Sequence, residues 1–178
     1  HSLGFYEVDE KPTQEELNAY YASKYYQEAK GSYEHAYEQD ELDWLNLKIK
    51  QRAYVVQSLT GKTEGSLLDV GCGEGFTLKH YADSGWEIRG IDFSKAGVTK
   101  ENSDMLNYLD VGDIYETLNS YQNQKRRYDV VYLTNVLEHV LDPIELLSNL
   151  KSIIKRRGVL VVTVPNDGSD LQEYCFAS

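Results

Sequence analysis

Apolar runs that alternate with stretches of helical periodicity from residue 66 onward constrain the fold more than any other feature of this chain. Runs rich in β-forming residues occupy 66–71, 86–94, 107–114, 128–137 and 159–166, and segments of helical character lie between them at 77–85, 95–105, 115–125 and 142–158. Strands separated by helices are joined by right-handed crossovers, which give a parallel sheet covered by helices on both faces. The continuous apolar stretches in the last two runs suit strands buried on both sides.

The residues before this alternation predict further helices. Thr13 and Glu16 have the spacing of a capping box, so a helix should begin there. Segment 41–59 repeats apolar residues at helical spacing, which predicts one buried face made of Leu42, Leu45, Ile49, Ala53, Val56 and Leu59. The predicted fold class is therefore α/β, a Rossmann-like doubly wound parallel sheet with an N-terminal helical segment. We divide the chain into a helical lead-in or cap over 1–60 and a Rossmann-like domain over 61–178.

The clearest helix is predicted after the fourth apolar run. Asp142 stands at its N-cap, Pro143 at its first position and Glu145 at its third. The basic residues 155–157 would complement the C-terminal end of the helix dipole, and Gly158 should take the C-cap turn.

Composition and charge narrow the classes of function. The net charge of −11, from 18 basic and 29 acidic residues, argues against a nucleic-acid partner, because binding a phosphate backbone needs a basic face. Cys72 and Cys175 are too few and too distant for a disulfide framework or a zinc site, and the four histidines lack metal-ligand spacing. No apolar run approaches the roughly 18 residues of a membrane span. We therefore predict no metal, no membrane span and a reducing, cytoplasmic location.

Glycines and acids follow the predicted strands where a ligand should lie. Ligands of open parallel sheets bind beyond the carboxyl ends of the strands. Asp92 follows the second strand, 21 residues after Gly71, and an acid about 20 residues past a glycine turn suits the two ribose hydroxyls of an adenosine. Asp113, after the third strand, would accept from the adenine amine, with Phe93 and Ile114 on either side of the purine. Each feature alone is explained by a tight turn or a helix cap, whereas their order and spacing favour an adenosine site.

The glycine loop decides which adenosine ligand fits. Dinucleotide-binding loops read G-x-G-x-x-G and hold a pyrophosphate at a helix N-terminus. Residues 71–75 read G-x-G-x-G instead, with Glu74 inside the loop. Glu74 would repel phosphates, whereas the sulfonium and ammonium of S-adenosylmethionine tolerate an acid there. The loop therefore favours S-adenosylmethionine over a dinucleotide.

Four stretches in order resemble the motifs of class I S-adenosylmethionine-dependent methyltransferases: LLDVGCGEGF, GIDFS, VGDI and YDVVYLTNVLEHVLDP. The resemblance runs over residues 66–166, and NVLEHVLDP is most similar to the branch that holds ubiquinone-type and other small-molecule enzymes. The flanking segments resemble bacterial relatives associated with sugar or polysaccharide synthesis. In those relatives two further strands follow. The resemblance therefore implies that 61–178 is an S-adenosylmethionine-binding domain without the last two of seven strands, either as a fragment or as a naturally short version.

The resemblance also assigns roles by position. The loop glycines would line the methionine moiety, with Cys72 contributing backbone, and Asn135 and Val136 would lie under the sulfonium. The implied cofactor is S-adenosyl-L-methionine, with S-adenosyl-L-homocysteine as product. The residues implied to bind it are Asp69, Gly71, Cys72, Gly73, Gly75, Phe76, Asp92, Phe93, Ser94, Asp113, Ile114, Asn135 and Val136.

Methyl transfer to a hydroxyl needs alignment of the two reactants and a base. His139 follows the fourth strand toward the ligand edge, and its ordinary pKa of about 6.5 suits a base near neutral pH. Glu138 is the weaker candidate, and a purely structural role for His139 stays open. Tyr25 or Tyr26 of the lead-in would close the pocket, although packing between helices is the favoured explanation for these rings.

The sequence thus predicts a methyltransferase that transfers a methyl group to a small molecule or to a glycan or lipid precursor. Two alternatives stay open. One is a non-catalytic S-adenosylmethionine-binding module, and the less favoured one is a nicotinamide-dependent oxidoreductase. No sequence feature selects the acceptor atom or the oligomeric state.

Overall fold

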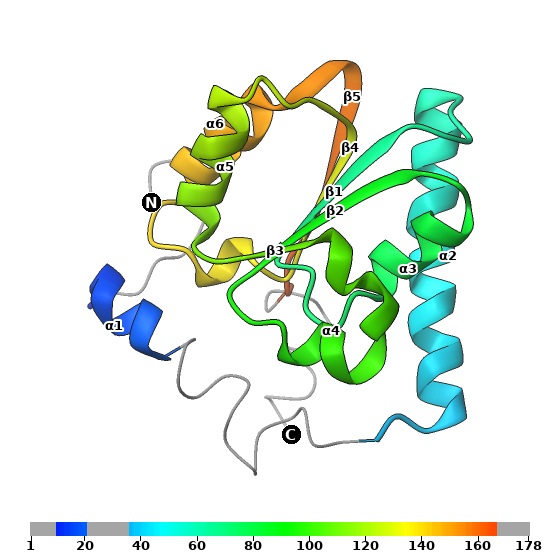
Figure 1. Ribbon diagram of the computed structural model, residues 1–178, viewed down its shortest axis with the longest axis horizontal. Coiled ribbons are helices and arrows are strands. Elements are labelled where there is room, and N and C mark those ends of the chain that lie inside the picture. The colour runs from blue at the N-terminus through cyan, green and yellow to red at the C-terminus, as the bar shows by residue number, and fades with distance from the viewer. Residues whose placement is uncertain (1–9, 21–35, 167–178) are drawn as a thin grey trace.

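A five-stranded parallel sheet forms the centre of the molecule in the computed structural model, which describes residues 10–20 and 36–166 (Figure 1). The strands are β1 (Ser66–Val70), β2 (Glu87–Asp92), β3 (Leu109–Val111), β4 (Tyr128–Thr134) and β5 (Ile154–Thr163). Their order is β3-β2-β1-β4-β5, and every neighbouring pair is parallel. The predicted doubly wound α/β class is confirmed, and the strand order reverses between β1 and β4.

Helices cover both faces of this sheet (Figure 1). The described helices are α1 (Gln14–Tyr20), α2 (Gln39–Thr60), α3 (Phe76–Asp83), α4 (Ala96–Glu101), α5 (Ile114–Asn123) and α6 (Pro143–Ser152), with short 3₁₀ turns at Ser103–Tyr108 and Leu137–His139. The helices α2 and α3 pack on one face, whereas α5 and α6 pack on the other. Each face has its own apolar core, and Val56 of α2 lies in the core that α3 shares. The proposed division at residue 60 stays a prediction.

Capping residues mark the start of α1 and the end of α2. The N–H of Thr13 donates to Glu16 Oε2 at 2.8 Å and the N–H of Glu16 donates back to Thr13 Oγ1 at 3.2 Å, which confirms the capping box at α1. The second helix, α2, ends at Thr60 and is followed by its C-cap Gly61, whose φ of 70° is left-handed. Leu59 was predicted on the buried face of α2, but it is 73% exposed, and that prediction is wrong. It lies four residues after Val55 and therefore on the same exposed side of α2 as that residue.

The helix α6 begins as predicted and ends earlier than predicted. Asp142 caps it by accepting from the Glu145 N–H at 2.8 Å. It ends at Ser152, because the carbonyl of Ile153 accepts from the Tyr128 N–H at 2.9 Å and thereby starts the pairing of β4 with β5. Residues 155–158 consequently form a bulge in β5 and do not form the last turn and C-cap of the helix.

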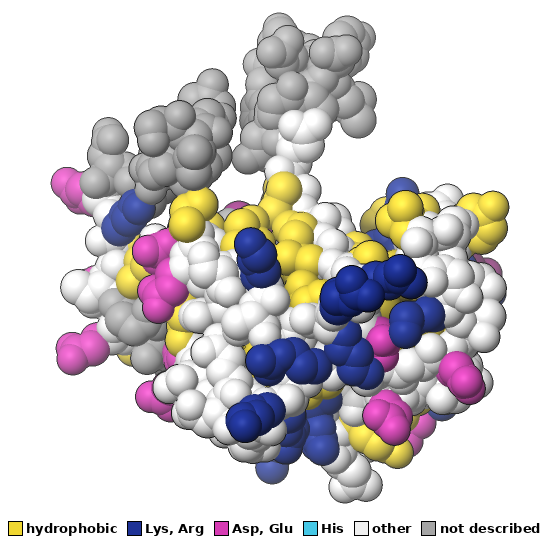
Figure 2. Space-filling model, turned by 90° about the horizontal axis from the view of Figure 1, so that it is seen from above, with side chains coloured by type: hydrophobic (Ala, Val, Ile, Leu, Met, Phe, Trp, Pro, Cys, Tyr) yellow, Lys and Arg dark blue, Asp and Glu magenta, His cyan; other side chains and the backbone are white. Residues whose placement is uncertain are grey.

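Basic side chains gather at the amino ends of the strands, although the chain as a whole is acidic (Figure 2). The two Lys-Arg-Arg triplets, 125–127 and 155–157, lie there together, because Tyr128 and Ile154 are partners at the start of β4 and β5. The net charge of the chain is therefore a weaker argument against an anionic partner than the sequence indicated, and the exclusion of nucleic acid stays a prediction.

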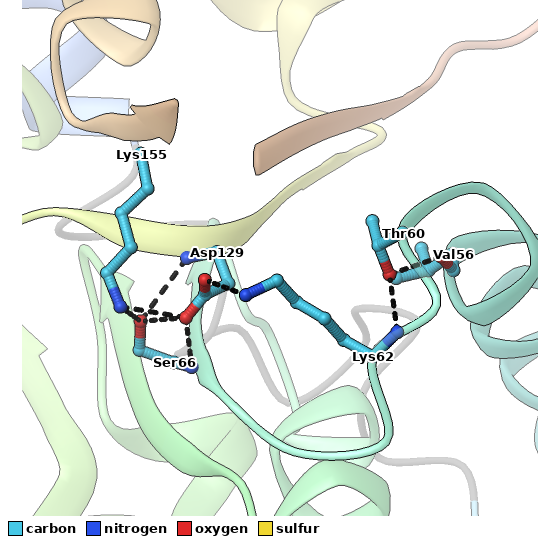
Figure 3. A network of polar contacts seen from close by, with 6 residues as sticks. All are labelled: Val56, Thr60, Lys62, Ser66, Asp129 and Lys155. Atoms are coloured by element: carbon cyan, nitrogen blue, oxygen red, sulfur yellow. Dashed lines mark hydrogen bonds and ion pairs between the residues drawn. The ribbon is translucent and has the colours of Figure 1, made fainter. Parts of the chain in front are cut away.

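A buried carboxylate ties this same end together (Figure 3). Asp129 accepts from Lys62 Nζ at 2.7 Å, from Lys155 Nζ at 2.8 Å and from the Ser66 N–H at 2.9 Å. Burial would raise its pKa, but the hydrogen bonds from the two lysines and from Ser66 outweigh burial and hold the pKa well below its usual range. The network joins the loop after α2 to the starts of β1, β4 and β5.

Within the described ranges, no helix is long and apolar enough to cross a membrane. Over the same residues, no three His, Cys, Asp or Glu side chains gather in a way that could hold a metal ion.

Candidate functional site

A cavity of about 310 Å³ opens at the carboxyl end of the sheet, beside the reversal of strand order between β1 and β4. Its walls come from α2, from the loops after β1, β2 and β4, and from the start of α5. Cavities of roughly 300–1,000 Å³ are usual for small ligands, and the switch point of a doubly wound sheet is where they bind.

The loop after β1 presents bare backbone to this cavity. Its three glycines have left-handed φ angles, which are 70° at Gly71, 55° at Gly73 and 80° at Gly75. The N–H groups of Gly71 and Cys72 both donate to the carbonyl of Ile91, which fixes the loop against the end of β2. A Cβ on Gly71 would overlap the side chain of Val136, whereas a Cβ on Gly73 would meet nothing within 4 Å. Gly71 is therefore required by close packing, and Gly73 faces open space.

Asp92 ends β2 with a buried carboxylate that organises the neighbouring loops. One oxygen accepts from the Gly73 N–H at 2.8 Å, and the other accepts from the Ser94 N–H at 3.0 Å. Each carboxylate oxygen has about two acceptor sites, so a carboxylate in this position can accept from several donors at once.

Asp69 and Arg52 bring opposite charges into the buried part of the cavity. Burial raises the pKa of Asp69 to about 7, with Arg52 opposing that rise and Asp92 adding to it. Among the described residues, two buried side-chain polar atoms have no hydrogen-bond partner, Arg52 Nε and Thr134 Oγ1. Both residues line this cavity, and buried polar groups are normally hydrogen-bonded.

Glu74 lines the cavity and is held by a residue that precedes α2. The Tyr37 hydroxyl donates to Glu74 Oε2 at 2.6 Å, and the Tyr37 ring packs edge-on against Phe76. Burial raises the pKa of Glu74, and the hydrogen bond from Tyr37 partly opposes the rise. Tyr25 and Tyr26, for which closure of the pocket was the less favoured explanation, lie outside the described residues.

The segment after β4 supplies the remaining wall. Asn135 has a left-handed φ of 53°, and its N–H donates to the Thr163 carbonyl at 2.8 Å. His139 lines the cavity with a side chain that is 45% exposed, and its Nε2 lies 3.9 Å from Glu138 Oε1. A ring at the solvent boundary of a cavity is accessible for proton exchange, and its role as a base stays a prediction.

Most of the predicted site residues meet in this cavity. Those that line it are Asp69, Gly71, Cys72, Gly73, Phe76, Asp92, Phe93, Ile114, Asn135, Val136 and His139. Gly75, Ser94 and Asp113 do not line it. Gly75 is the N-cap of α3, the Ser94 hydroxyl accepts from the Ala96 N–H, and Asp113 caps α5 by accepting from the Glu116 N–H at 3.0 Å. The assignment of all the predicted residues to the cofactor, including those that line the cavity, stays a prediction.

Sequence reasoning missed the contribution of α2. The residues that line the cavity without having been predicted are Leu45, Ile49, Arg52, Thr77, Thr134 and Val140. One signal for Arg52 was present, because it falls on the same helical face as Ile49 and Val56, both of which are buried. A charged residue on an apolar face is costly unless it is paired, and it therefore marks a candidate site.

A family model described as a methyltransferase domain matches residues 43–175. This match covers most of the chain, and the chain belongs to that methyltransferase family. The family agrees with the resemblance of the four sequence motifs.

Curated relatives give the same class. The chain is 30% identical over 121 residues to a ubiquinone biosynthesis O-methyltransferase of Histophilus somni, covering 64% of this chain and 50% of the relative. It is 30% identical over 129 residues to the enzyme of the same name from Aliivibrio fischeri, covering 70% and 53%. The chain thus spans about half the length of the curated relatives it matches.

Solved structures share the fold. A SAM-dependent methyltransferase from Archaeoglobus fulgidus superposes with a TM-score of 0.60 at 23% identity, over 76% of this chain and 58% of that one. The plantazolicin methyltransferase BpumL, in complex with a substrate analogue and SAH, superposes with a TM-score of 0.56 at 24% identity, over 69% and 48%.

Proposed function

We propose that this chain binds S-adenosylmethionine and forms the cofactor-binding part of a methyltransferase acting on a small molecule. The observation that carries the proposal is the cavity at the switch point, where the bare backbone of Gly73 and the buried carboxylate of Asp92 meet. Family membership and the shared fold support it.

The charges around the cavity suit a cationic ligand better than a pyrophosphate. Asp69, Glu74 and Asp92 all line it, and even with Asp69 partly protonated the negative charge of these carboxylates would repel phosphate at close range. The sulfonium and ammonium of S-adenosylmethionine are positively charged, and the same carboxylates would attract them. Arg52 and Thr134 would bind the carboxylate of its methionine moiety, which would give both buried groups the partner they otherwise lack.

The other contacts follow from the same placement. Asp92 would accept from the two ribose hydroxyls, while Phe93 and Ile114 would pack on the adenine. When bound, the cofactor supplies an electrophilic methyl group whose leaving group is neutral. The residues of this chain would therefore act by holding and aligning the reactants, which is the main requirement for such a displacement.

We further propose that the acceptor is a hydroxyl group of a small molecule, in the cytoplasm. The relatives named as O-methyltransferases support this class of acceptor. His139 at the cavity mouth would take the proton of the hydroxyl, with Glu138 beside it. An acceptor hydroxyl on a glycan or lipid precursor is a narrower form of the same proposal.

Calorimetry with S-adenosylhomocysteine and with NAD⁺ tests the cofactor. We expect binding of the first and none of the second. Asp92→Asn should lower affinity for S-adenosylhomocysteine by at least about tenfold, because a hydrogen bond to a charged group contributes roughly 1.5–3 kcal/mol. The matched control is Asp104→Asn, at an exposed acid that pairs with Lys79, and this variant should bind normally.

Two outcomes would contradict the proposal. Unchanged affinity in Asp92→Asn would remove the ribose assignment, and preferential binding of NAD⁺ would favour the oxidoreductase. Formation of S-adenosylhomocysteine in a screen of small hydroxyl-bearing acceptors would separate a catalyst from a non-catalytic binding module.

A further inference from the structure

The hydroxyl of Tyr37 is bonded to an acid that lines the candidate cofactor cavity, although Tyr37 itself precedes α2. It donates to Glu74 Oε2 at 2.6 Å, across 37 positions of sequence. Its ring packs edge-on against Phe76, with the ring centroids 5.7 Å apart, and Phe76 also lines the cavity. These contacts hold the residue before α2 against the glycine loop.

The backbone that carries Glu74 is held by other elements. Asn102 is 9% exposed, and its Nδ2 donates to the Glu74 carbonyl at 2.8 Å. Gly97 of α4 packs directly against the loop, because a Cβ at this position would lie 2.7 Å from the Gly73 carbonyl oxygen and 3.2 Å from Glu74 Cγ. With its backbone bound by Asn102 and its carboxylate bound by Tyr37, Glu74 presents its charge at a defined place in the cavity wall.

Glu74 differs from the other two carboxylates of the cavity in the kind of partner that holds it. Asp92 accepts from two backbone N–H groups. Asp69 lies near Arg52, and the positive charge of that guanidinium opposes the charge of Asp69. Among the described residues, Glu74 is held by a neutral hydroxyl and forms no ion pair with a basic side chain. Its negative charge is therefore the least compensated of the three.

A tyrosine hydroxyl can hold a carboxylate without cancelling its charge, as a lysine or an arginine would. The Tyr37 hydroxyl stays protonated, because burial and its hydrogen bond to Glu74 raise its pKa. The same bond favours the charged form of Glu74 and partly opposes the rise in pKa that burial causes. Lys100, whose charge also acts on Glu74, is paired with Glu101 at 3.2 Å. Glu74 is therefore an oriented negative charge that a ligand can meet.

We propose that Glu74, with Tyr37 as its positioning residue, makes the cavity prefer the sulfonium of S-adenosylmethionine over the neutral thioether of S-adenosylhomocysteine, an inference that rests on the proposed function. The two ligands differ by one methyl group and by the positive charge that it creates on sulfur. A fixed carboxylate in the cavity wall attracts the donor more strongly than the product for that reason alone. This preference limits occupation of the site by spent product.

Calorimetry at pH 8, above the pKa of about 7 of Asp69, gives the dissociation constants of both ligands, and the ratio of the product's constant to the donor's is the readout. Glu74→Gln should lower this ratio by about fivefold, or about 1 kcal/mol, which is the interaction of two unit charges roughly 4 Å apart in water. Tyr37→Phe keeps the ring against Phe76 and should lower the ratio by about threefold, because the carboxylate loses its fixed position. A merely structural defect would weaken both ligands alike and leave the ratio unchanged.

Matched variants and a double variant isolate the role of each residue. Glu87→Gln removes the same charge from an exposed position at the amino end of β2, and Tyr54→Phe removes a hydroxyl from an exposed ring of α2. Both should keep the wild-type ratio. The double variant Tyr37→Phe, Glu74→Gln should have the same ratio as Glu74→Gln alone, because a positioning residue acts only through the side chain that it holds. Circular dichroism should be unchanged in all of these variants.

The outcomes separate this proposal from the proposed function. An unchanged ratio in Glu74→Gln, with both ligands still bound, would overturn the proposal and leave the proposed function in place. Additive effects of Tyr37→Phe and Glu74→Gln on the ratio would overturn the positioning role of Tyr37. Binding of neither ligand to the wild-type chain would overturn the proposed function, and this proposal with it.

Discussion

Asp69 is the residue whose protonation most directly reports on the candidate site. Its carboxyl is buried at the end of β1, and burial raises its pKa to about 7 despite the nearby Arg52. The usual value for an aspartate is about 3.9. A substantial fraction of Asp69 is therefore protonated near neutral pH, and a cation brought into the cavity would favour the charged form.

This coupling predicts that ligand binding releases a proton. At pH 6.5, the ammonium of zwitterionic S-adenosylhomocysteine, placed against Asp69 while Arg52 and Thr134 hold the ligand's carboxylate, should lower the pKa of Asp69 and displace part of a proton into the buffer. Calorimetry in two buffers of different ionisation enthalpy measures that release, and affinity should rise between pH 6 and pH 8. Asp69→Asn is the control and should release markedly less, with Glu74, whose pKa burial also raises, as the other source of protons in the cavity. Identical apparent enthalpies in the two buffers for the wild-type chain would contradict the prediction.

For single residues of the candidate site, the sequence located the acids better than the residues that lie beside them. Asp92 could be predicted from its spacing to the glycine turn, and it lines the cavity. Asp113 has the same kind of position, yet its carboxylate is a helix cap, and strand ends do not distinguish these roles. Helical spacing places Arg52 on the buried face of α2, but its position in the cavity depends on how α2 packs against the sheet, which no local pattern specifies. The Tyr37–Glu74 contact spans 37 positions and was missed for the same reason.

At the scale of elements, the loop between β1 and α3 depends on backbone that only glycine adopts without strain. Gly71 and Gly61 share a φ of 70°, but their surroundings differ. A Cβ at Gly71 would overlap Val136, which follows β4, whereas a Cβ at Gly61 would meet nothing within 4 Å. Alanine substitutions at Gly71 and Gly61 therefore separate two losses of stability, the strain of left-handed backbone and the overlap of a new side chain with its neighbours.

Gly71→Ala should destabilise the chain by about 2–4 kcal/mol, since roughly 1–2 kcal/mol arises from left-handed strain and the rest from overpacking against Val136. It should also weaken binding of S-adenosylhomocysteine, because the loop must shift to make room. Gly61→Ala carries only the strain and should lose about 1–2 kcal/mol with unchanged binding. Urea unfolding of both variants gives the comparison. Equal losses of stability at the two positions would show that packing at Gly71 is not limiting.

Element boundaries show where local patterns stop being sufficient. The start of α6 could be predicted because its cap uses neighbours in the chain, Asp142 and Glu145. Its end could not, because the carbonyl of Ile153 bonds to Tyr128 of another strand. Residues 155–157 look like a basic helix end in sequence and form a bulge in β5 in the fold. Long-range pairing overrides helix propensity at that point.

At the scale of the whole molecule, the two ends of the sheet have opposite electrostatic character. Acidic side chains line the cavity at the carboxyl ends of the strands, whereas Lys and Arg gather at the amino ends (Figure 2). Asp129 is the buried acid at that basic end, where Lys62 and Lys155 converge on it (Figure 3). The composition gives the sum of these charges, while their separation arises only when the crossovers bring distant loops together.

The Asp129 network predicts how stability depends on pH. The pKa of Asp129 is lowered in the folded chain, so its contribution is fully present above the unfolded value of about 3.9 and is lost as pH falls toward the folded value. Asp129→Asn should cost about 2–4 kcal/mol near pH 7, somewhat less than breaking a fully buried pair, because both lysines reach solvent. Urea unfolding of wild type and variant should show this difference shrinking below about pH 4.

The pH dependence must be measured as the difference in stability between wild type and Asp129→Asn, because Asp69 changes the stability with pH in the opposite direction. Its raised pKa makes the folded chain hold a proton that the unfolded chain releases, so its contribution falls as pH rises from about 4 to about 7. Wild type and Asp129→Asn share Asp69, and its effect cancels in their difference. Asp83→Asn, which breaks an exposed pair with Lys79, is the matched control and should change stability little at any pH. A difference for Asp129→Asn that stays constant from pH 7 to pH 3 would show that the carboxylate stabilises the fold through shape and not through charge.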